Sequence, residues 1–176
     1  MGYSDPSVVG TLPLEMSETM NGSWGFNLVD DKYKSPETLV RTLVGAAGRN
    51  ANFLLNTGPM PNGEIQPENL ATFRTIGEWM TAHGKTIYGT RGGPIAPGAW
   101  GVTTQRGKTV YVHLMRVHDG RVTLPIDAPM RGTVASARLF DGGAPVKVMA
   151  GKGRIELSGL PPLGKAWDQI VVLELR

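Results

Sequence analysis

Apolar positions in the first half of the chain recur at helical spacing. Between residues 35 and 50 they form the i, i+3/i+4 stripe of a half-buried helix. The stripe consists of Leu39, Val40, Leu43, Val44 and Ala47. Ser35 suits the N-cap of this helix and Pro36 suits its first position. The pattern predicts that the helix ends near residues 48–50, at a glycine and an asparagine.

A short apolar run and a second helical pattern follow. Residues 53–55 are continuously apolar and end at an asparagine, a glycine and a proline, which predicts a buried strand, parallel because helices flank it. Pro67 and Gly84 bound the next helix. Its predicted inner stripe is Leu70, Phe73, Ile76, Gly77 and Met80. Helix, strand and helix in this order indicate the end of an α/β domain with a parallel sheet.

The second half has the period-2 alternation of β-strands. A Gly/Pro-rich connector covers residues 89–101, and six short β-rich runs separated by turn signals come after it. These runs are 108–115, 121–126, 134–140, 145–150, 154–159 and 169–176. They predict an antiparallel β-sandwich. We therefore divide the chain into an α/β segment, 1–90, and a β-sandwich, 91–176.

The α/β segment is too small to close a parallel sheet on its own. A parallel sheet needs both faces covered, and about 90 residues with one strand–helix unit make a poor core. We expect Leu39, Val40, Leu43 and Val44, together with residues 53–55, to pack on elements outside this chain. The segment by itself should expose an apolar patch and an unpaired strand edge, which favours self-association.

Composition narrows the function classes. No apolar run is long enough to cross a membrane, and the net charge of +3 is spread without a basic cluster that would bind nucleic acid. The absence of cysteine excludes disulfides and a cysteine nucleophile. No residue spacing suggests a metal site, a phosphate loop or another cofactor. The first residues do not read as a signal peptide, so the compartment stays open: periplasmic or secreted if a longer parent carries one.

Candidate chemistry is concentrated in the stretch LPLEMSETMNGSWGF, residues 12–26. It holds two carboxylates, Glu15 and Glu18, and one aromatic residue, Trp24. The stretch has neither clean helical nor clean strand periodicity, so we expect a glycine-punctuated loop. Apolar neighbours around Glu15 would favour a raised pKa, as a general acid requires. The same carboxylates could instead be solvated loop acids, and Trp24 could be a core aromatic.

Three motifs together resemble the glycoside hydrolase family 29 α-L-fucosidases. They are SWGF, NFLLNTGP and GEW…IYGT, in this order and spacing. The resemblance covers about residues 8–95, while the β-rich remainder resembles the family's C-terminal sandwich only in position and style. It implies the C-terminal fragment of a (β/α)₈-like barrel followed by an antiparallel β-sandwich. The implied activity is release of terminal α-L-fucose from a fucosylated glycan or glycoside, with retention of configuration and without a cofactor.

The resemblance also implies roles for individual residues. Glu15 matches the acid/base position of one branch of the family, and Glu18 is a weaker candidate for the same role. Trp24 matches a residue that lines the fucose pocket, and Asn56 a supporting position at the end of its strand. The family's nucleophile, an aspartate, lies upstream of these motifs, so the chain alone should be inactive or nearly so. Its expected partner is the missing N-terminal part of the barrel, or a second copy of itself.

A non-enzymatic function is the alternative. The sandwich could be a carbohydrate-binding or structural module, with the α/β segment as a remnant of a barrel. Trp100, Tyr111 or Trp167 would then stack on sugar rings. Exposure of these aromatics in a flat row would favour this hypothesis, and their burial would weaken it.

Overall fold

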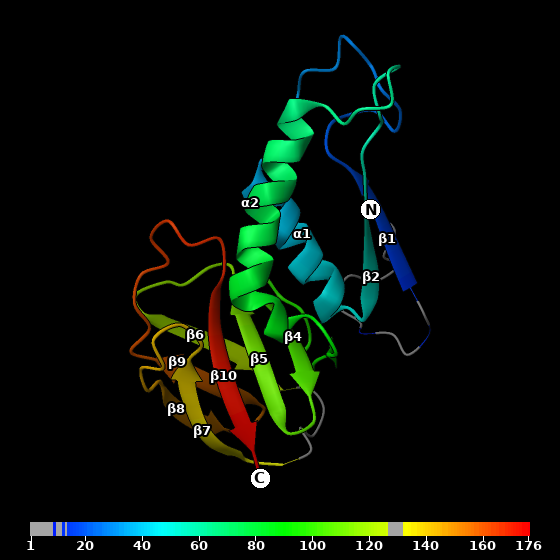
Figure 1. Ribbon diagram of the computed structural model, residues 1–176. Helices are drawn as coiled ribbons and strands as arrows, with labels where there is room; N and C mark the ends of the chain where they lie inside the picture. The colour runs from blue at the N-terminus through cyan, green and yellow to red at the C-terminus, as the bar shows by residue number, and fades with distance from the viewer. Residues whose placement is uncertain (1–8, 10–11, 13, 127–131) are drawn as a thin grey trace.

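The chain folds as a mostly β structure with two long helices (Figure 1). The computed structural model describes residues 9, 12, 14–126 and 132–176. The first part contains β1 (Leu14–Thr19), α1 (Pro36–Gly48), β2 (Ala51–Asn56), α2 (Pro67–His83) and the 3₁₀ turn η1 (Gly84–Thr86). The second part contains β3 (Arg91–Gly92), β4 (Gly101–Arg106), β5 (Thr109–Leu114), β6 (Arg121–Pro125), β7 (Val134–Leu139), β8 (Lys147–Gly151), β9 (Arg154–Ser158) and β10 (Gln169–Leu175).

Both helices begin and end where the sequence predicts. The Ser35 hydroxyl accepts a hydrogen bond from the backbone N–H of Thr38 at 3.1 Å, so it caps α1, and Pro36 occupies the first turn. Helix α2 starts at Pro67 and is followed by Gly84. Ser35, Pro36 and Pro67 account for the two helix starts, whereas Gly84 keeps right-handed helical φ and ψ and begins η1. Neither helix of the described chain is long and apolar enough to cross a membrane.

Strands β1 and β2 form a two-stranded parallel sheet, with Leu14 opposite Ala51 and Thr19 opposite Asn56. The parallel orientation predicted for β2 is confirmed. The loop predicted for residues 12–26 is wrong over 14–19, which are strand β1. Within this chain the residues of β2 are half-buried or exposed, which agrees with the expectation that residues 53–55 pack on elements outside it. In the described chain each strand of this sheet has one neighbour, which leaves both outer edges unpaired.

The remaining strands form two antiparallel sheets, in the orders β3-β4-β5-β10-β7 and β6-β9-β8. The apolar core between them includes Val112 and Leu173 of the larger sheet and Leu124 and Leu157 of the smaller one. The six predicted strands are confirmed, whereas β3 and β4 were missed. Strand β4 was missed because two of its buried residues, Thr103 and Thr104, are polar and so break the apolar pattern used to predict strands. Both are fully buried, and hydrogen bonds satisfy their hydroxyl groups.

Helix α1 packs on the sandwich. Val40 and Val44 are buried in a cluster with Val102 of β4. Gly48 lies so close to β4 that a Cβ there would be 2.4 Å from Val102. Leu39 is buried as well. The expectation that the apolar stripe of α1 packs on absent elements is therefore wrong for Val40 and Val44, which β4 covers, and for Leu39, which is buried within this chain.

Helix α2 uses only part of its predicted stripe. Ile76 and Trp79 pack against the cluster around Val102. Leu70 and Phe73, nearer the start of the helix, remain 40% and 37% exposed. Figure 1 shows the reason: α2 rises beyond the sandwich, so its first half has no sheet beneath it. Within this chain the predicted stripe is thus wrong for Leu70 and Phe73, and also for Gly77, which is exposed.

Candidate active site at the carboxyl ends of β1 and β2

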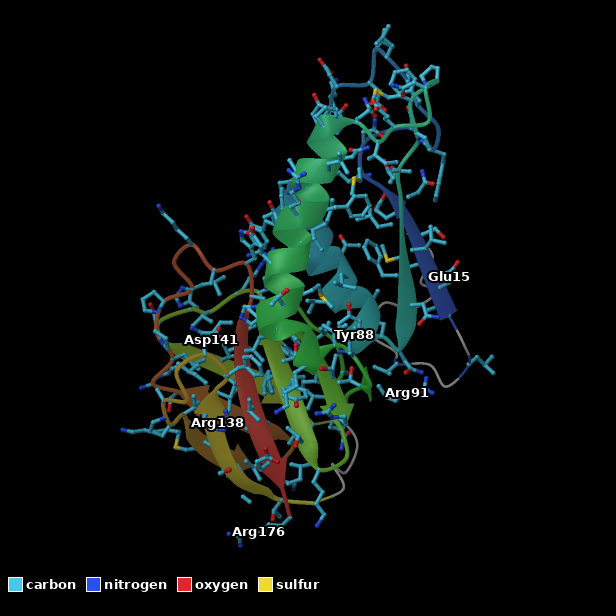
Figure 2. The ribbon with its side chains drawn as sticks, in the orientation of Figure 1. Glu15, Tyr88, Arg91, Arg138, Asp141 and Arg176 are labelled. Atoms are coloured by element: carbon cyan, nitrogen blue, oxygen red, sulfur yellow. The ribbon has the colours of Figure 1, made fainter. Side chains whose placement is uncertain are left out.

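Three of the four candidate residues, Glu18, Trp24 and Asn56, lie near the ends of two parallel strands, whereas Glu15 lies near the start of β1. We call residues 20–35, which connect β1 to α1, the site loop. Because Thr19 pairs with Asn56 in the register, the site loop and the segment after β2 leave the same edge of the sheet. In parallel α/β folds this carboxyl edge is where loops build the active site. Figure 2 shows both strands beside the helices, with Glu15 labelled on β1.

Lys34 joins the end of the site loop to the end of β1. Its ammonium donates to Glu18 Oε1 at 2.8 Å, to the Thr19 carbonyl at 2.7 Å, to Thr19 Oγ1 at 3.0 Å and to the Asn21 carbonyl at 2.9 Å. An ammonium has three protons, so at least one is shared between two acceptors. The Thr19 hydroxyl in turn donates to the Asn21 carbonyl. A single cation therefore fixes the start of the site loop.

A second set of hydrogen bonds closes the site loop around its middle. Ser23 Oγ donates to Asp30 Oδ2 at 2.7 Å, and Asn27 Nδ2 donates to Ser23 Oγ at 3.2 Å. Asn21 is buried, and its side chain donates to the Asp30 carbonyl at 3.4 Å. Asn21 and Ser23 thus hold the loop closed through Asp30.

Trp24 is presented to solvent by backbone contacts. Asn56 Nδ2 donates to the Trp24 carbonyl at 2.5 Å. A Cβ on Gly58 would lie 2.3 Å from the backbone at Gly25 and Phe26, so only a glycine lets the two segments approach. The Trp24 side chain remains 55% exposed. An exposed indole on a backbone fixed by these contacts is suited to bind an apolar face of a ligand.

Glu15 and Glu18 lie on opposite faces of β1. Alternate residues of a strand point to opposite sides, and Met16 and Glu18 are half-buried while Glu15 and Ser17 are exposed. On β2 the exposed residues are Asn52 and Leu54, which pair with Glu15 and Ser17. Glu15 therefore points away from the helices, as Figure 2 shows. It lies four residues before Thr19, about 13 Å from the carboxyl edge at ~3.3 Å per residue.

Glu18 is held by Lys34 on the helix side of the sheet. The hydrogen bond from Lys34 lowers the pKa of Glu18, outweighing its partial burial, and the backbone N–H of Thr19 lowers that pKa further. A general acid needs the opposite shift, so that it is protonated at working pH. The geometry of Glu18 suits a structural carboxylate that anchors the site loop.

Two surface hollows lie away from this edge. One, of about 410 Å³, is lined by residues at the start of β2 and by the segment after η1, Tyr88 and Arg91 included. The other, of about 380 Å³, lies between α2 and the sandwich and is lined by Trp79, His83 and Asp168 among others. Among the described residues no group of three or more His, Asp or Glu side chains could hold a metal ion.

The aromatics of the sandwich are turned inward. Tyr111 is only 3% exposed and packs in a cluster with Ile170 and Val172. Trp100 packs against the main core of the sandwich and Trp167 against the cluster around Val102. The flat row of exposed rings that the carbohydrate-binding alternative requires is not formed by these three residues.

Lys34 is the residue of this site that sequence reasoning missed. It lies 16 positions after Glu18, too far for any local pattern to pair them. The predicted N-cap at Ser35 was an indirect signal, because it places Lys34, the preceding residue, at the junction between the loop and the helix. Its partner could be known only after β1 was placed beside it.

The fold is similar to the C-terminal part of solved family 29 α-L-fucosidases. The α-L-fucosidase isoenzyme 1 from Paenibacillus thiaminolyticus superposes with a TM-score of 0.81 at 31% identity, over 94% of this chain and 40% of the enzyme. A family 29 α-L-fucosidase from Bacteroides thetaiotaomicron superposes with a TM-score of 0.84 at 25% identity, over 99% of this chain and 41% of the enzyme.

Sequence comparison identifies the family of the first half. Residues 2–85 match the family model described as alpha-L-fucosidase, and this region belongs to that family. The alpha-L-fucosidase of Branchiostoma floridae is 28% identical over 141 residues, which are 74% of this chain and 30% of the relative. Plasma alpha-L-fucosidase of Homo sapiens is 28% identical over 102 residues, 53% of this chain and 22% of the relative. The chain thus spans less than a third of the length of these relatives.

Proposed function

We propose that the chain is part of a retaining α-L-fucosidase that releases terminal α-L-fucose from a fucosylated glycan or glycoside. In this proposal residues 1–90 are the end of a (β/α)₈-like barrel and residues 91–176 are its C-terminal sandwich. The observation that carries the proposal is the structural likeness to family 29 enzymes over 94–99% of the chain. The parallel β1–β2 pair, with helices on one side and open edges, is consistent with two adjacent barrel strands.

The orientation of Glu15 supports its assignment as the general acid/base. In a closed (β/α)₈ barrel the helices lie outside, so the face of β1 that points away from α1 and α2 would face the interior. Glu15 is on that face and Glu18 is not. We therefore assign Glu15 as the acid/base, Trp24 as a wall of the sugar pocket, and Asn56 as the residue that positions Trp24. Glu18 serves as the anchor of Lys34 rather than in catalysis.

Retention requires a second carboxyl group, which attacks the anomeric carbon and forms a glycosyl–enzyme intermediate. A structural relative from Bacteroides thetaiotaomicron, 25% identical, is described as a trapped covalent intermediate with 2-fluoro-fucosyl fluoride, obtained with a glutamate-to-glutamine mutant. Within the 176 residues we assign no nucleophile. In our proposal a segment outside this sequence supplies that carboxylate together with the missing strands.

The test is a chimera in which the upstream part of the Paenibacillus thiaminolyticus enzyme is joined to this chain. We expect it to hydrolyse aryl α-L-fucosides, whereas the 176-residue chain alone should show little or no turnover. In the chimera, Glu15→Gln should abolish hydrolysis of fucosides with poor leaving groups. It should spare the cleavage step of dinitrophenyl fucoside, because that leaving group needs no proton.

Controls separate catalysis from folding. Glu18→Gln should lower stability and leave the dependence on the leaving group unchanged, since Glu18 acts through Lys34. Trp24→Ala should raise KM for fucosides in the chimera. If Glu15→Gln slows good and poor leaving groups equally, Glu15 is not the acid/base. If the chain alone turns over fucoside, the assignment of an external nucleophile is wrong.

A further inference from the structure

A buried chain of hydrogen bonds connects the helical part of the molecule to the sandwich. It runs from Asp168, before β10, through His113 of β5 and Thr104 of β4 to the carbonyl of Thr86 in η1. The side chains of His113 and Asp168 are both 0% exposed, and Thr104 is fully buried. We call these four residues the buried hydrogen-bond chain. Its residues come from η1, two strands and a loop, so it exists only in the folded state.

The distances fix where the protons are. Thr104 Oγ1 lies 2.6 Å from the Thr86 carbonyl, which can only accept, so the single hydroxyl proton of Thr104 must point there. His113 Nε2 lies 3.2 Å from the same hydroxyl oxygen, and it must therefore carry a proton and donate. On the other side of the ring, Nδ1 lies 2.6 Å from Asp168 Oδ2, and two bare acceptors at that distance would repel. A second proton must lie between them.

We propose that His113 and Asp168 together hold one proton more than a neutral imidazole and a free carboxylate hold, and that this proton keeps η1 and the end of α2 fixed on the sandwich. Its loss would leave a net negative charge in a site without solvent. Without the extra proton, one of two contacts would also lack a hydrogen. It would be either the contact of His113 Nδ1 with Asp168 Oδ2 or the contact of His113 Nε2 with Thr104 Oγ1. Either change breaks the chain, and alkaline pH should therefore loosen the junction.

The connectivity resembles that of a hydrolytic triad, but its hydrogen bonds exclude that role. A nucleophilic hydroxyl must donate to the imidazole, and the Thr104 hydroxyl instead donates to a backbone carbonyl. No substrate can reach a threonine that is fully buried. The chain is therefore a structural device located between the part that carries the candidate active site and the sandwich.

Charged groups surround one end of the chain. Glu78 and His83 of α2 and Asp141 and Lys165 of the sandwich line the same hollow as Asp168. His83 pairs with Asp141 at 3.2 Å in a largely exposed contact, so solvent screens it. From α1, Arg41 Nε donates to the carbonyl of Trp167, next to Asp168. None of these groups contacts Asp168 Oδ2, and His113 is its partner.

Nitrogen-15 NMR of the histidine rings tests the proton count directly. In the folded 176-residue chain at pH 7.5, we expect the Nε2 of His113 to be protonated and a strongly deshielded proton to lie between Nδ1 and Asp168. A bare Nε2 on His113 would overturn the proposal, whatever the behaviour of any variant.

Asp168→Asn tests the function of the proton. An asparagine amide can donate to Nδ1 while Nε2 still donates to Thr104, so this variant completes the chain without the extra proton. Hydrogen exchange of the Ile87 and Tyr88 amides, corrected for intrinsic exchange rates, gives the equilibrium constant for local opening. In the wild type this constant should rise by up to tenfold per pH unit between pH 7 and 9. These amides donate to the Gly84 carbonyl within η1.

The variants give the deciding comparison. The alkaline rise should be absent in Asp168→Asn and retained in Asp141→Asn, which removes the exposed partner of His83 in the same hollow. Amides in the centre of β5 and β10 should show no comparable rise. If wild type and Asp168→Asn open with the same pH dependence, or if Asp141→Asn removes it, the proposal is wrong.

Discussion

Replacing Lys34 with methionine isolates the interaction that holds the site loop. Methionine keeps the length and apolar stem of lysine and removes the ammonium. The substitution leaves the carbonyls of Thr19 and Asn21 and the Glu18 carboxylate without the donor they share. Hydrogen bonds to a charged group contribute about 1.5–3 kcal/mol each, and an unmade buried one costs about 1–3 kcal/mol.

The net cost is smaller than the sum of these terms. The side chains of Lys34 and Glu18 are 30% and 28% exposed, so water can replace part of what is lost and screen the charges. The Thr19 N–H also remains on Glu18. We therefore expect a loss of about 2–3 kcal/mol in the free energy of unfolding, a large fraction of the 5–15 kcal/mol of a typical domain.

Urea unfolding followed by circular dichroism measures this loss, with Lys32→Met as the matched control. Lys32 lies in the same loop and is exposed. The pH dependence supplies a second test. Because Lys34 lowers the pKa of Glu18, the stabilisation is present at neutral pH and is lost as pH falls through the lowered pKa. Lys34→Met should show a smaller acid loss, because the Thr19 N–H still lowers the pKa of Glu18. A cost equal to that of Lys32→Met would refute the reasoning.

Three further predictions concern packing. Gly48→Ala should lower Tm by several degrees, because its Cβ would meet Val102 at 2.4 Å. The control Gly45→Ala, whose nearest neighbour is a flexible arginine at 3.5 Å, should be neutral or stabilise the protein by about 0.5–1 kcal/mol. Equal effects of the two substitutions would contradict the close approach of α1 and β4. Gly58→Ala, 2.3 Å from the site loop backbone, should quench or shift the tryptophan fluorescence of the loop and lower stability by about 1–3 kcal/mol; an unchanged spectrum and Tm would argue against that contact. The isolated chain should self-associate and bind ANS through its open β1–β2 sheet, and Leu54→Glu, on the exposed face, should shift it towards monomer in sedimentation; a monomeric wild-type chain without ANS binding would exclude this.

The Lys34 and Gly58 substitutions should also affect the proposed fucosidase activity. The site loop presents Trp24, and both Lys34 and Gly58 act on the backbone of that loop rather than on a ligand. In the active chimera their variants should therefore raise KM for fucosides more than they lower the cleavage rate. Glu15→Gln should do the reverse, since a proton donor acts in the transition state.

The sequence by itself determined the elements whose signals are local. Ser35 and Pro36 set the start of α1, and Pro67 sets the start of α2, because caps and proline act within one turn. Six sandwich strands followed from alternation and from turn residues between them. The family of residues 2–85 was also accessible, since three short motifs occur in a fixed order.

Only the tertiary structure decided which elements and side chains pack against each other. Strand β4 was missed because buried threonines read as polar until their hydrogen-bond partners are known, and β4 proved to be the surface that covers Val40 and Val44. Burial of a helix face depends on a partner that no local pattern names. The same reason applies to β1, whose two glutamates look alike in sequence and fall on opposite faces of the sheet.

The ion pairs that join distant segments were decided by the tertiary structure. Lys34 reaches Glu18 across 16 positions, and His113 meets Asp168 across 55. A charged or titratable residue can pair with any opposite group that the fold brings near it, so its sequence neighbours carry little information about its partner. The chain's composition supplied these groups, and only the packing of helices, strands and loops assigned Lys34 to the site loop and a shared proton to the junction with the sandwich.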